Sequence, residues 1–278
     1  EWSLYGYERK TTPRMEKLDG LVHFTDVVTQ SNNTHKSVPI ILSAASAEDY
    51  GVIYDEKSIV TAFKEAGFHT VVIANQNLNT SMIGAFYREA DTFIDMSQFK
   101  TGSSYLTSLH DGALLPYLQK ELDKTDGNLF FVIHTYGSHF NYHERYPKEF
   151  AFYTPDKAEG IRAAYKTQLR NAYDNSIHYT DYVLGEITDM LAKTNACVSM
   201  LYLSDHGEDI FDDSRARYLH ASPIPTYYQL HIPYIIWFSE AYRAAYPEKY
   251  QIAMSHSTLP VSTNSVFHTV LDIAGVCT

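Results

Sequence analysis

The sequence predicts an α/β fold in which helices flank a mostly parallel central sheet. Four short apolar runs have the composition of buried parallel strands, at residues 70–74, 129–134, 198–204 and 232–238. Helical patterns alternate with these runs, and that alternation is typical of a mostly parallel sheet. The length favours one domain over residues 1–278, because a chain that is 45% hydrophobic can bury a single large core.

Three helices are expected around this sheet. The first covers residues 58–66 and is stopped by Gly67, and the last covers residues 264–274 and is stopped by Gly275. A long helical pattern runs from about residue 161 to residue 193. We expect the helices to cover both faces of the sheet, since every predicted strand is apolar on both sides.

Polar side chains follow the predicted strands where each strand ends. His134 and His139 come at the end of the second run, and Asp205 and His206 come directly after the third. Ligands bind at the carboxyl ends of strands in open α/β sheets, so these side chains are expected to share one site. Imidazole beside carboxylate is a ligand pattern of metal sites.

The strongest single pattern is the segment 201–208, an apolar run that ends in Asp205, His206 and Gly207. Adjacent Asp and His side chains can turn toward one cation, and glycine lets the backbone bend there. A strand-end turn with solvent-facing polar residues is the alternative interpretation. The buried run before the pair and Glu208 after it favour a metal site.

Charge limits the partners of this chain. The 22 Lys plus Arg and 33 Asp plus Glu give a net charge of −11, which argues against nucleic acid or an anionic membrane surface as an electrostatic partner. No apolar run reaches the roughly 18 residues that span a bilayer. Residue 1 lies inside a motif, so we expect the sequence to be a truncated part of a longer protein.

The segment 204–208 reads Ser-Asp-His-Gly-Glu and resembles the metal motif of phosphoethanolamine transferases, lipoteichoic acid synthases and their sulfatase-like relatives. Segments 218–220 (Tyr-Leu-His) and 231–234 (His-Ile-Pro-Tyr) are similar to the motifs that follow it. Upstream, segment 6–13 resembles the Gly-Tyr-x-Arg-x-Thr-x-Pro pattern that marks the bacterial phosphoethanolamine transferases of the alkaline-phosphatase/sulfatase superfamily. The resemblance runs in order over nearly the whole chain.

Segment 34–39 is similar to the family's Thr-x-x-Ser-Val-Pro motif, which implies that Thr34 is the nucleophile. A threonine hydroxyl attacks poorly at neutral pH unless a metal stabilises its ionised form. Thr34 taken alone is a typical helix N-cap residue. The two interpretations are compatible, because a helix N-terminus favours a bound phosphate.

The resemblance also implies roles for the remaining polar residues. His139 and His220 are expected to bind the substrate phosphate or a second metal, and Asn75 to lie near the substrate head group. Glu208 is expected to orient His206 or the turn. His134 lies within an apolar run, which indicates a buried histidine with a hydrogen-bond partner. Phe140 and the residue after it replace the family's Gly-Pro, so the substrate pocket is expected to differ there.

By this resemblance the chain is a zinc-dependent enzyme. Asp205, His206 and Thr34 would bind Zn²⁺ together with a glutamate of a Gly-Glu-Ser/Thr segment expected about six residues before Glu1. Phosphoethanolamine would pass from phosphatidylethanolamine to Thr34 and then to lipid A or another envelope glycan. The domain would face the periplasm, anchored in the inner membrane by helices upstream of residue 1.

Three rival functions remain. A sulfatase is disfavoured, since its Cys/Ser-x-Pro-x-Arg motif would need arginine where Ile41 follows Pro39 and Ile40. A phosphoglycerol transferase of the lipoteichoic-acid-synthase type shares the threonine and the Ser-Asp-His-Gly-Glu motif but is not expected to carry the 6–13 pattern. A binding domain that has lost its chemistry would also keep the fold.

Overall fold

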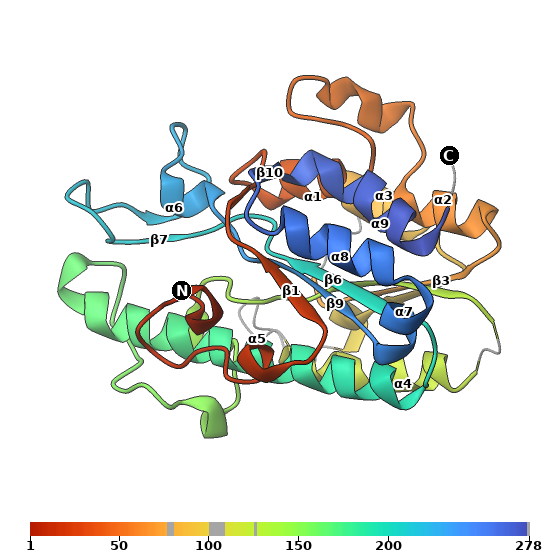
Figure 1. Ribbon diagram of the computed structural model, residues 1–278. Coiled ribbons are helices and arrows are strands. Elements are labelled where there is room, and N and C mark those ends of the chain that lie inside the picture. Colours follow the sequence, from red (N-terminus) through yellow and green to blue (C-terminus); the bar gives the residue numbers. More distant parts are fainter. Residues whose placement is uncertain (77–80, 100–108, 125–126, 277–278) are drawn as a thin grey trace.

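The computed structural model describes residues 1–76, 81–99, 109–124 and 127–276, and confirms the α/β class. Strands lie in a central layer, with α4 and α5 on one side and α1, α2, α3 and α9 on the other (Figure 1). The strands are β1 Leu21–Phe24, β2 Val27–Val28, β3 His69–Ala74, β4 Thr92–Asp95, β5 Leu129–His134, β6 Ser199–Leu203, β7 Asp209–Ile210, β8 Tyr218–Leu219, β9 Tyr234–Phe238 and β10 Val261–Ser262. The helices are α1 Thr34–Ile41, α2 Ile59–Glu65, α3 Met82–Tyr87, α4 Leu115–Leu122, α5 Lys166–Lys193, α6 Tyr227–Leu230, α7 Glu240–Ala245, α8 Pro247–His256 and α9 Val266–Ala274.

The strands β4, β3 and β5 form a parallel sheet in that order, which we call the β3 sheet. Its middle strand is the most deeply buried, because five of the six residues of β3 are buried. Val72 and Ala74 pack against α1, α2 and α3, whereas Val71 and Ile73 pack against α4 and α5. The apolar run predicted at 70–74 is therefore a strand covered on both faces.

The strands β1, β9 and β6 form a second sheet, the β9 sheet, and this sheet is antiparallel. The prediction that the run 232–238 is a parallel strand is wrong: β9 pairs antiparallel with β6, so that Leu203 lies opposite Tyr234. Burial on both faces gives the same apolar run in either direction, which is why the pattern did not distinguish them. The residues before β9 consequently lie at the same edge as the residues after β6.

The predicted helices form with small shifts. α2 is capped by Ser58, whose hydroxyl accepts a hydrogen bond from the Val60 amide. The long helix α5 begins at Lys166 rather than near residue 161, because Arg162 has extended backbone angles and a short 3₁₀ turn follows. α9 ends at Gly275, which has a positive φ of 69° and so supplies the left-handed stop that was predicted.

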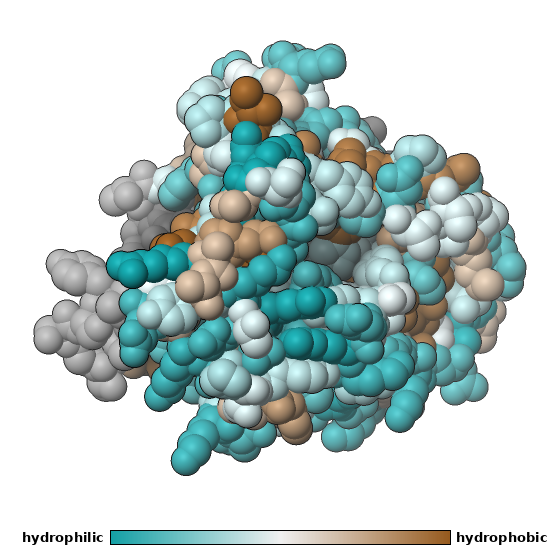
Figure 2. All heavy atoms as spheres, turned by 90° about the vertical axis from the view of Figure 1, so that its left-hand side faces the viewer, coloured by the Kyte–Doolittle hydropathy of each residue, from teal (hydrophilic) through white to brown (hydrophobic). Residues whose placement is uncertain are grey.

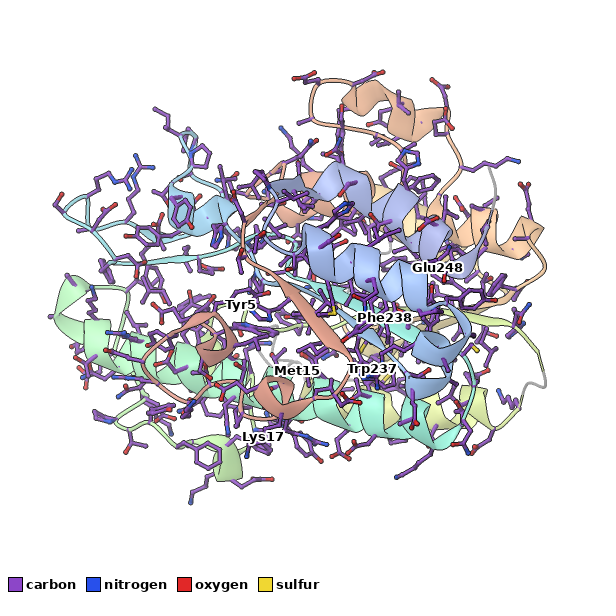
Figure 3. The ribbon with its side chains drawn as sticks, viewed as in Figure 1. Tyr5, Met15, Lys17, Trp237, Phe238 and Glu248 are labelled. Carbon is purple, nitrogen blue, oxygen red and sulfur yellow. The ribbon has the colours of Figure 1, made fainter. Side chains whose placement is uncertain are left out.

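The segment 6–13 is tied to α5 by polar contacts. Arg9 Nη1 lies 2.8 Å from Asp174 Oδ2, and the Tyr7 hydroxyl donates to the same oxygen at 2.9 Å. Asp174 is fully buried, and these two donors satisfy its Oδ2, whereas its Oδ1 has no hydrogen-bond partner among the described residues. Tyr5, labelled in Figure 3, donates its hydroxyl to the Tyr234 carbonyl at 2.9 Å. The motif thus holds the start of the chain against both α5 and β9.

Candidate active site

Thr34 is the first residue of α1, and its side chain points into the site. The helix N-cap is Asn33, whose side-chain oxygen accepts a hydrogen bond of 3.0 Å from the His35 amide. The interpretation of Thr34 as the cap is therefore wrong. Because the Asn33 side chain caps the start of α1, the Thr34 hydroxyl is available for another partner. Thr34 Oγ1 lies 3.2 Å from His206 Nε2.

Helix α1 is short because Pro39 lies inside it. Proline has no amide hydrogen, so the carbonyl of His35 loses its helical partner. The hydroxyl of Tyr50 donates to that carbonyl instead, at 3.1 Å. The segment that carries Thr34 is thus fixed by a cap at its start and by a tyrosine from the next loop.

Asp205 and His206 leave β6 at its carboxyl end, as predicted. His206 Nδ1 lies 3.0 Å from the Gly207 carbonyl. A carbonyl only accepts hydrogen bonds, so Nδ1 carries the proton and Nε2 of the neutral ring has a free lone pair. That nitrogen lies 3.2 Å from Thr34 Oγ1 and 3.6 Å from Asp205 Oδ2.

The two distances from His206 Nε2 to Thr34 Oγ1 and to Asp205 Oδ2 are close to the spacing of metal ligands. Tetrahedral zinc with bonds of about 2.0–2.1 Å separates neighbouring ligand atoms by about 3.3 Å. Asp205 Oδ2 is buried and, among the described residues, has no hydrogen-bond partner. A carboxylate oxygen in that position is stabilised by a cation. Asp205, His206 and Thr34 therefore fit a zinc ion in both geometry and chemistry.

Gly207 is required by a close approach rather than by a bend. Its φ is not positive, but a Cβ atom at this position would lie 2.1 Å from the Tyr228 carbonyl oxygen. The Gly207 amide also donates to the Gln229 carbonyl at 2.9 Å. Any side chain here would push the metal-site turn away from α6.

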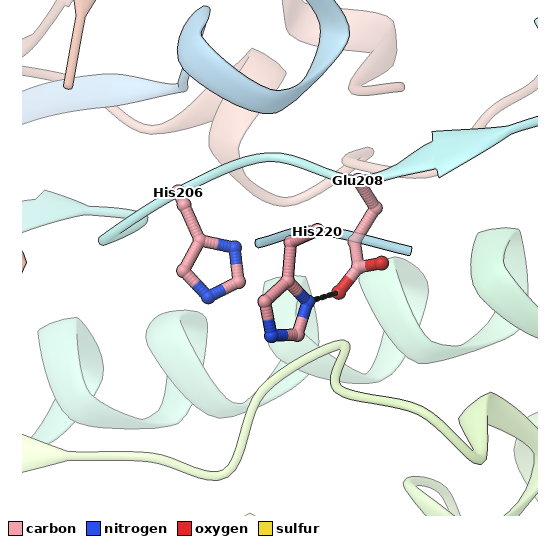
Figure 4. A group of neighbouring side chains, drawn as sticks. All are labelled: His206, Glu208 and His220. Carbon is pink, nitrogen blue, oxygen red and sulfur yellow. Dashed lines mark hydrogen bonds and ion pairs between the residues drawn. The ribbon is translucent and has the colours of Figure 1, made fainter. Parts of the chain in front are cut away.

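Glu208 orients His220 rather than His206. Its Oε1 lies 2.7 Å from His220 Nδ1, and its Oε2 accepts a 3.1 Å hydrogen bond from the Tyr142 hydroxyl. The dashed line in Figure 4 marks the contact between Glu208 and His220. Both carboxylate oxygens of Glu208 are thus engaged. Glu208 fixes the ring of His220 through Nδ1 and makes no bond to its Nε2.

A second set of potential ligands is formed by His206, Glu208 and His220 (Figure 4), whose donor atoms lie within 4.8 Å of one another. We favour the set of Asp205, His206 and Thr34, since Glu208 is already committed to two hydrogen bonds. The rings of His206 and His220 are neighbours, with centroids 4.1 Å apart.

His139 lies on the opposite wall, in the loop after β5. Its ring centroid is 5.6 Å from that of His220, and its Nδ1 lies 2.6 Å from the Phe140 carbonyl. As in His206, the proton is therefore on Nδ1. Burial lowers the pKa of His139, so the ring is neutral at pH 7 and can accept or coordinate through Nε2.

Asn75 does not line the site, contrary to the prediction. It is buried, and its Nδ2 donates to Asp111 Oδ1 at 2.7 Å. Asp111 in turn accepts hydrogen bonds from the amides of Tyr136 and Gly137, at 2.7 and 2.8 Å. Asn75 and Asp111 thus anchor the loop that carries His139, and Gln76 lines the cavity instead.

His134 has the hydrogen-bond partner that its apolar run indicates, although the residue is only partly buried. Its Nδ1 lies 2.6 Å from the Tyr87 hydroxyl. Burial lowers the pKa of His134, which keeps this ring neutral.

Gln229 is a central residue that the sequence did not reveal. It is 1% exposed, and its Nε2 donates to Asp209 Oδ2 at 2.5 Å. Its Oε1 accepts from Asn32 Nδ2 at 2.6 Å and from Ser222 Oγ at 2.9 Å. Asn32 lies just before the candidate nucleophile, so one glutamine joins three loops of the site. No local motif marks it, because its partners come from distant segments.

The site opens into a cavity of about 1070 Å³ lined by Thr34, His139, Asp205, His206 and Glu208 among others. Figure 2 views the side of the molecule that carries α6 and β7, where hydrophilic residues predominate and a few hydrophobic ones are interspersed. Tyr227 and Tyr228 of α6 also line the cavity and are 63% and 39% exposed. The site is thus accessible from a partly aromatic rim.

The chain belongs to the sulfatase family, because the family model named Sulfatase matches residues 1–276. Its relatives within the family include phosphoethanolamine transferases. It is 30% identical to EptA of Salmonella typhimurium, covering 100% of this chain and 51% of that protein. It is 28% identical to EptC of Escherichia coli K12, covering 99% of this chain and 48% of that protein.

Solved structures show the same fold. The C-terminal periplasmic domain of Escherichia coli EptC, in complex with Zn, superposes with a TM-score of 0.87 at 26% identity over 99% of this chain and 78% of that chain. The soluble domain of lipooligosaccharide phosphoethanolamine transferase A from Neisseria meningitidis gives 0.88 at 27% identity over 98% and 82%. The chain spans about half the length of the curated relatives it matches. Among its described residues, no helix is long and apolar enough to cross a membrane.

Proposed function

We propose that this chain is the catalytic domain of a phosphoethanolamine transferase with Thr34 as its nucleophile. The observation that carries the proposal is the 3.2 Å separation between Thr34 Oγ1 and His206 Nε2, beside an Asp205 oxygen without a hydrogen-bond partner among the described residues. The names of the relatives and the zinc complex of the Escherichia coli domain support it.

In this proposal Asp205, His206 and Thr34 bind zinc, and a glutamate upstream of Glu1 completes the ligands. Zinc supplies a positive charge that lowers the pKa of the Thr34 hydroxyl and offsets charge on the phosphate. His206 is held in the tautomer that leaves Nε2 free, and Glu208 keeps His220 oriented. Neither ring has to rotate before it acts.

The reaction proceeds in two displacements at phosphorus. Thr34 Oγ1 attacks the phosphorus of phosphatidylethanolamine, and the bond from phosphorus to the diacylglycerol oxygen breaks as that oxygen takes a proton. An acceptor oxygen of lipid A or another envelope glycan then attacks phospho-Thr34 and releases the threonine hydroxyl. His220 contacts a phosphate oxygen, His139 would act through a second metal ion at the phosphate because its Nε2 carries a lone pair, and the amides at the start of α1 add favourable dipoles.

The exposed rim of the cavity fits a lipid donor. Tyr227 and Tyr228 have apolar rings with polar tips, which suit the interface between acyl chains and head groups. A domain on the periplasmic side of the inner membrane, tethered by upstream helices, would meet such a donor at the bilayer surface. The net charge of −11 does not attract an anionic substrate over a distance. Substrate binding therefore depends on local contacts in the site.

The test is mass spectrometry of the full-length protein incubated with phosphatidylethanolamine. A peptide carrying phosphoethanolamine on Thr34 is expected, and Thr34→Ala should abolish both adduct and transfer. Thr25→Ala, a change at an exposed threonine, is the matched control. An adduct on Ser37, or normal transfer by the Thr34 variant, would refute the nucleophile. A phosphoglycerol adduct would assign the donor to the rival class.

A further inference from the structure

The stretch from Tyr218 to Ser239 carries no ionised side chain: it contains no Asp, Glu, Lys or Arg, in a chain of which 20% of residues are charged. For β9 this composition is explained by burial, because all five of its residues are buried. Residues 221–228, which we call the α6 tip, lie mostly at the surface. Burial does not explain the absence of charge there.

The α6 tip is exposed and apolar. Ile224 is 73% exposed, Tyr227 is 63% exposed and Tyr228 is 39% exposed, and prolines 223 and 225 are exposed as well. The helix α6 lies at the edge of the molecule, to the left of both sheets in Figure 1. Single exposed apolar residues are common, but five of them within six residues, with no charge among them, indicate an interaction surface.

The base of the α6 tip is buried and fixed. Thr226 is 2% exposed, and its hydroxyl donates to Asp209 Oδ1 at 2.8 Å. Gln229 donates to the other oxygen of the same carboxylate. The Tyr227 ring also stacks on His231, with ring centroids 4.7 Å apart. The exposed residues therefore project from a rigid base.

The backbone of the α6 tip has few groups that require water. Its two prolines have no amide hydrogen. The carbonyl of Ile224 accepts hydrogen bonds from the Arg217 guanidinium and, at 3.2 Å, from the Ser222 hydroxyl. The carbonyl of Ser222 accepts from Asn32 Nδ2 at 3.0 Å. Backbone groups that enter an apolar phase need such partners within the protein.

We infer that the α6 tip inserts into the surface of a phospholipid bilayer, beside the entrance to the candidate active site. Ile224 would reach the boundary of the acyl chains, and the rings of Tyr227 and Tyr228 would lie among the head groups, where an apolar ring with a polar hydroxyl is favourable. This inference rests on the proposed function, since it takes the donor to be a membrane phospholipid.

Charge favours a zwitterionic surface. The α6 tip has no lysine or arginine to attract anionic lipids, and the net charge of −11 opposes them. Close approach of a bilayer costs least where no ionised side chain loses its water. The α6 tip is such a place, so the molecule is expected to approach the bilayer with this edge first.

The size of the surface favours lipid over a protein partner. A stable protein interface buries about 800 Å² on each partner and involves about 20–30 residues a side. Five exposed side chains fall short of that. Insertion of a few apolar side chains into a bilayer is sufficient when it adds to another anchor.

Insertion of the α6 tip would place the candidate active site at the level of the lipid head groups. Tyr227 and Tyr228 line the same cavity as Thr34 and His206. A phospholipid beside the tip would therefore present its phosphate at the entrance of that cavity while its acyl chains stay in the bilayer.

Photo-crosslinking of the full-length protein in vesicles of phosphatidylcholine and phosphatidylethanolamine tests the contact. With benzoylphenylalanine in place of Ile224, cross-links to phospholipid are expected. The same probe in place of Ile252, which is 53% exposed on α8 beside the charged Lys249, should give none. Cross-links from position 224 only to another part of the protein, or to a second copy, would overturn the inference, and so would the absence of lipid cross-links.

Transfer kinetics of the full-length protein test the consequence. With phosphatidylethanolamine in vesicles, Ile224→Asp should raise KM by about tenfold with kcat unchanged, because one inserted apolar side chain is lost. With dihexanoyl phosphatidylethanolamine dissolved as monomers, the same variant should match the parent. Ile252→Asp is the control and should match the parent with both donors.

An equal loss with both donors, or an unchanged KM with vesicles, would overturn the membrane contact. Failure of the parent to use either donor would instead refute the proposed function. The cross-linking result would still decide where the α6 tip lies.

Discussion

The hydroxyl of Ser37 donates a 2.6 Å hydrogen bond to the main-chain oxygen of Asp205. The Thr29 hydroxyl donates to the same oxygen at 2.7 Å. A helix residue and a loop residue thus fix the backbone of a candidate metal ligand. This contact gives the serine of the Thr-x-x-Ser-Val-Pro motif a physical role, one turn after the threonine it accompanies.

Ser37→Ala is expected to weaken zinc binding by about 10–100-fold in the full-length protein, because it loosens the backbone that aims Asp205. The loss of stability should be only about 1 kcal/mol. Ser43→Ala is the matched control, since Ser43 is also buried and donates to a main-chain carbonyl, that of Pro39 at 2.7 Å. Calorimetric zinc titration measures both. Equal affinities in the two variants would contradict a positioning role.

Substitutions at the four candidate ligands should divide into two classes. Asp205→Ala and His206→Ala remove direct ligands and should lose tightly bound zinc together with transfer. His139→Ala and His220→Ala should keep one zinc ion and transfer more slowly. Metal content by mass spectrometry, measured beside the transfer rate, distinguishes the classes. Equal loss of metal in all four variants would disprove this division.

Gln229→Leu should destabilise the protein and slow transfer together. The change leaves the Asp209 carboxylate and the Asn32 amide without their buried partner, at about 1–3 kcal/mol for each group. Gln119→Leu is the control, because Gln119 is exposed on α4 and its side-chain amide donates to Asp123, one turn further along the same helix. That variant should stay within about 0.5 kcal/mol of the parent. Urea denaturation reports the difference, and similar values for the two variants would be contrary to expectation.

Arg9→Met should destabilise the protein in a pH-dependent way. Burial, together with the nearby Glu1 carboxylate, raises the pKa of Asp174 from 3.8 to about 6 despite its bond to Arg9. In the parent, the contribution of Asp174 to stability therefore falls as pH rises from about 4 to about 6 and is level above that. Without Arg9 the pKa rises further, so stability keeps falling above pH 6.

The expected cost of Arg9→Met is about 3–5 kcal/mol at pH 8 and much less at pH 5, where Asp174 is protonated in both proteins. Denaturation at the two pH values measures it. Lys10→Met is the control, because Lys10 pairs with Glu16 at the surface and should change stability by less than about 1 kcal/mol at either pH. A cost for Arg9→Met that is the same at both pH values would rule out the titration of Asp174.

The sequence predicted elements well where one physical pattern decides them. The runs that became β3, β5, β6 and β9 are apolar on both faces, and their positions were right to within two residues. Strand direction was not predictable, because a strand buried on both faces has the same composition in either direction. The short strands β1 and β4 were missed, since four residues give too little periodicity.

The site residues that belong to a local sequence motif were predicted. The site residues whose roles depend on contacts between distant segments were missed. Asp205, His206 and Thr34 come together as their motifs indicate. The cap was misassigned because Asn33 and Thr34 are both good cap residues and adjacent. The roles of Gln229 and Asp111 depend on partners far along the chain, which no single-sequence pattern reveals.

His139 follows β5 and His220 lies between β6 and β9, so the two imidazoles stand on different sheets. The distance of 5.6 Å between their ring centroids therefore depends on how the two halves of the molecule are placed relative to each other. Any change in the placement of β5 relative to β6 would therefore alter the distance between these two rings. Phe131 of β5 and Met200 of β6 both line the cavity, so substitutions there are expected to act on the site through the spacing of its histidines.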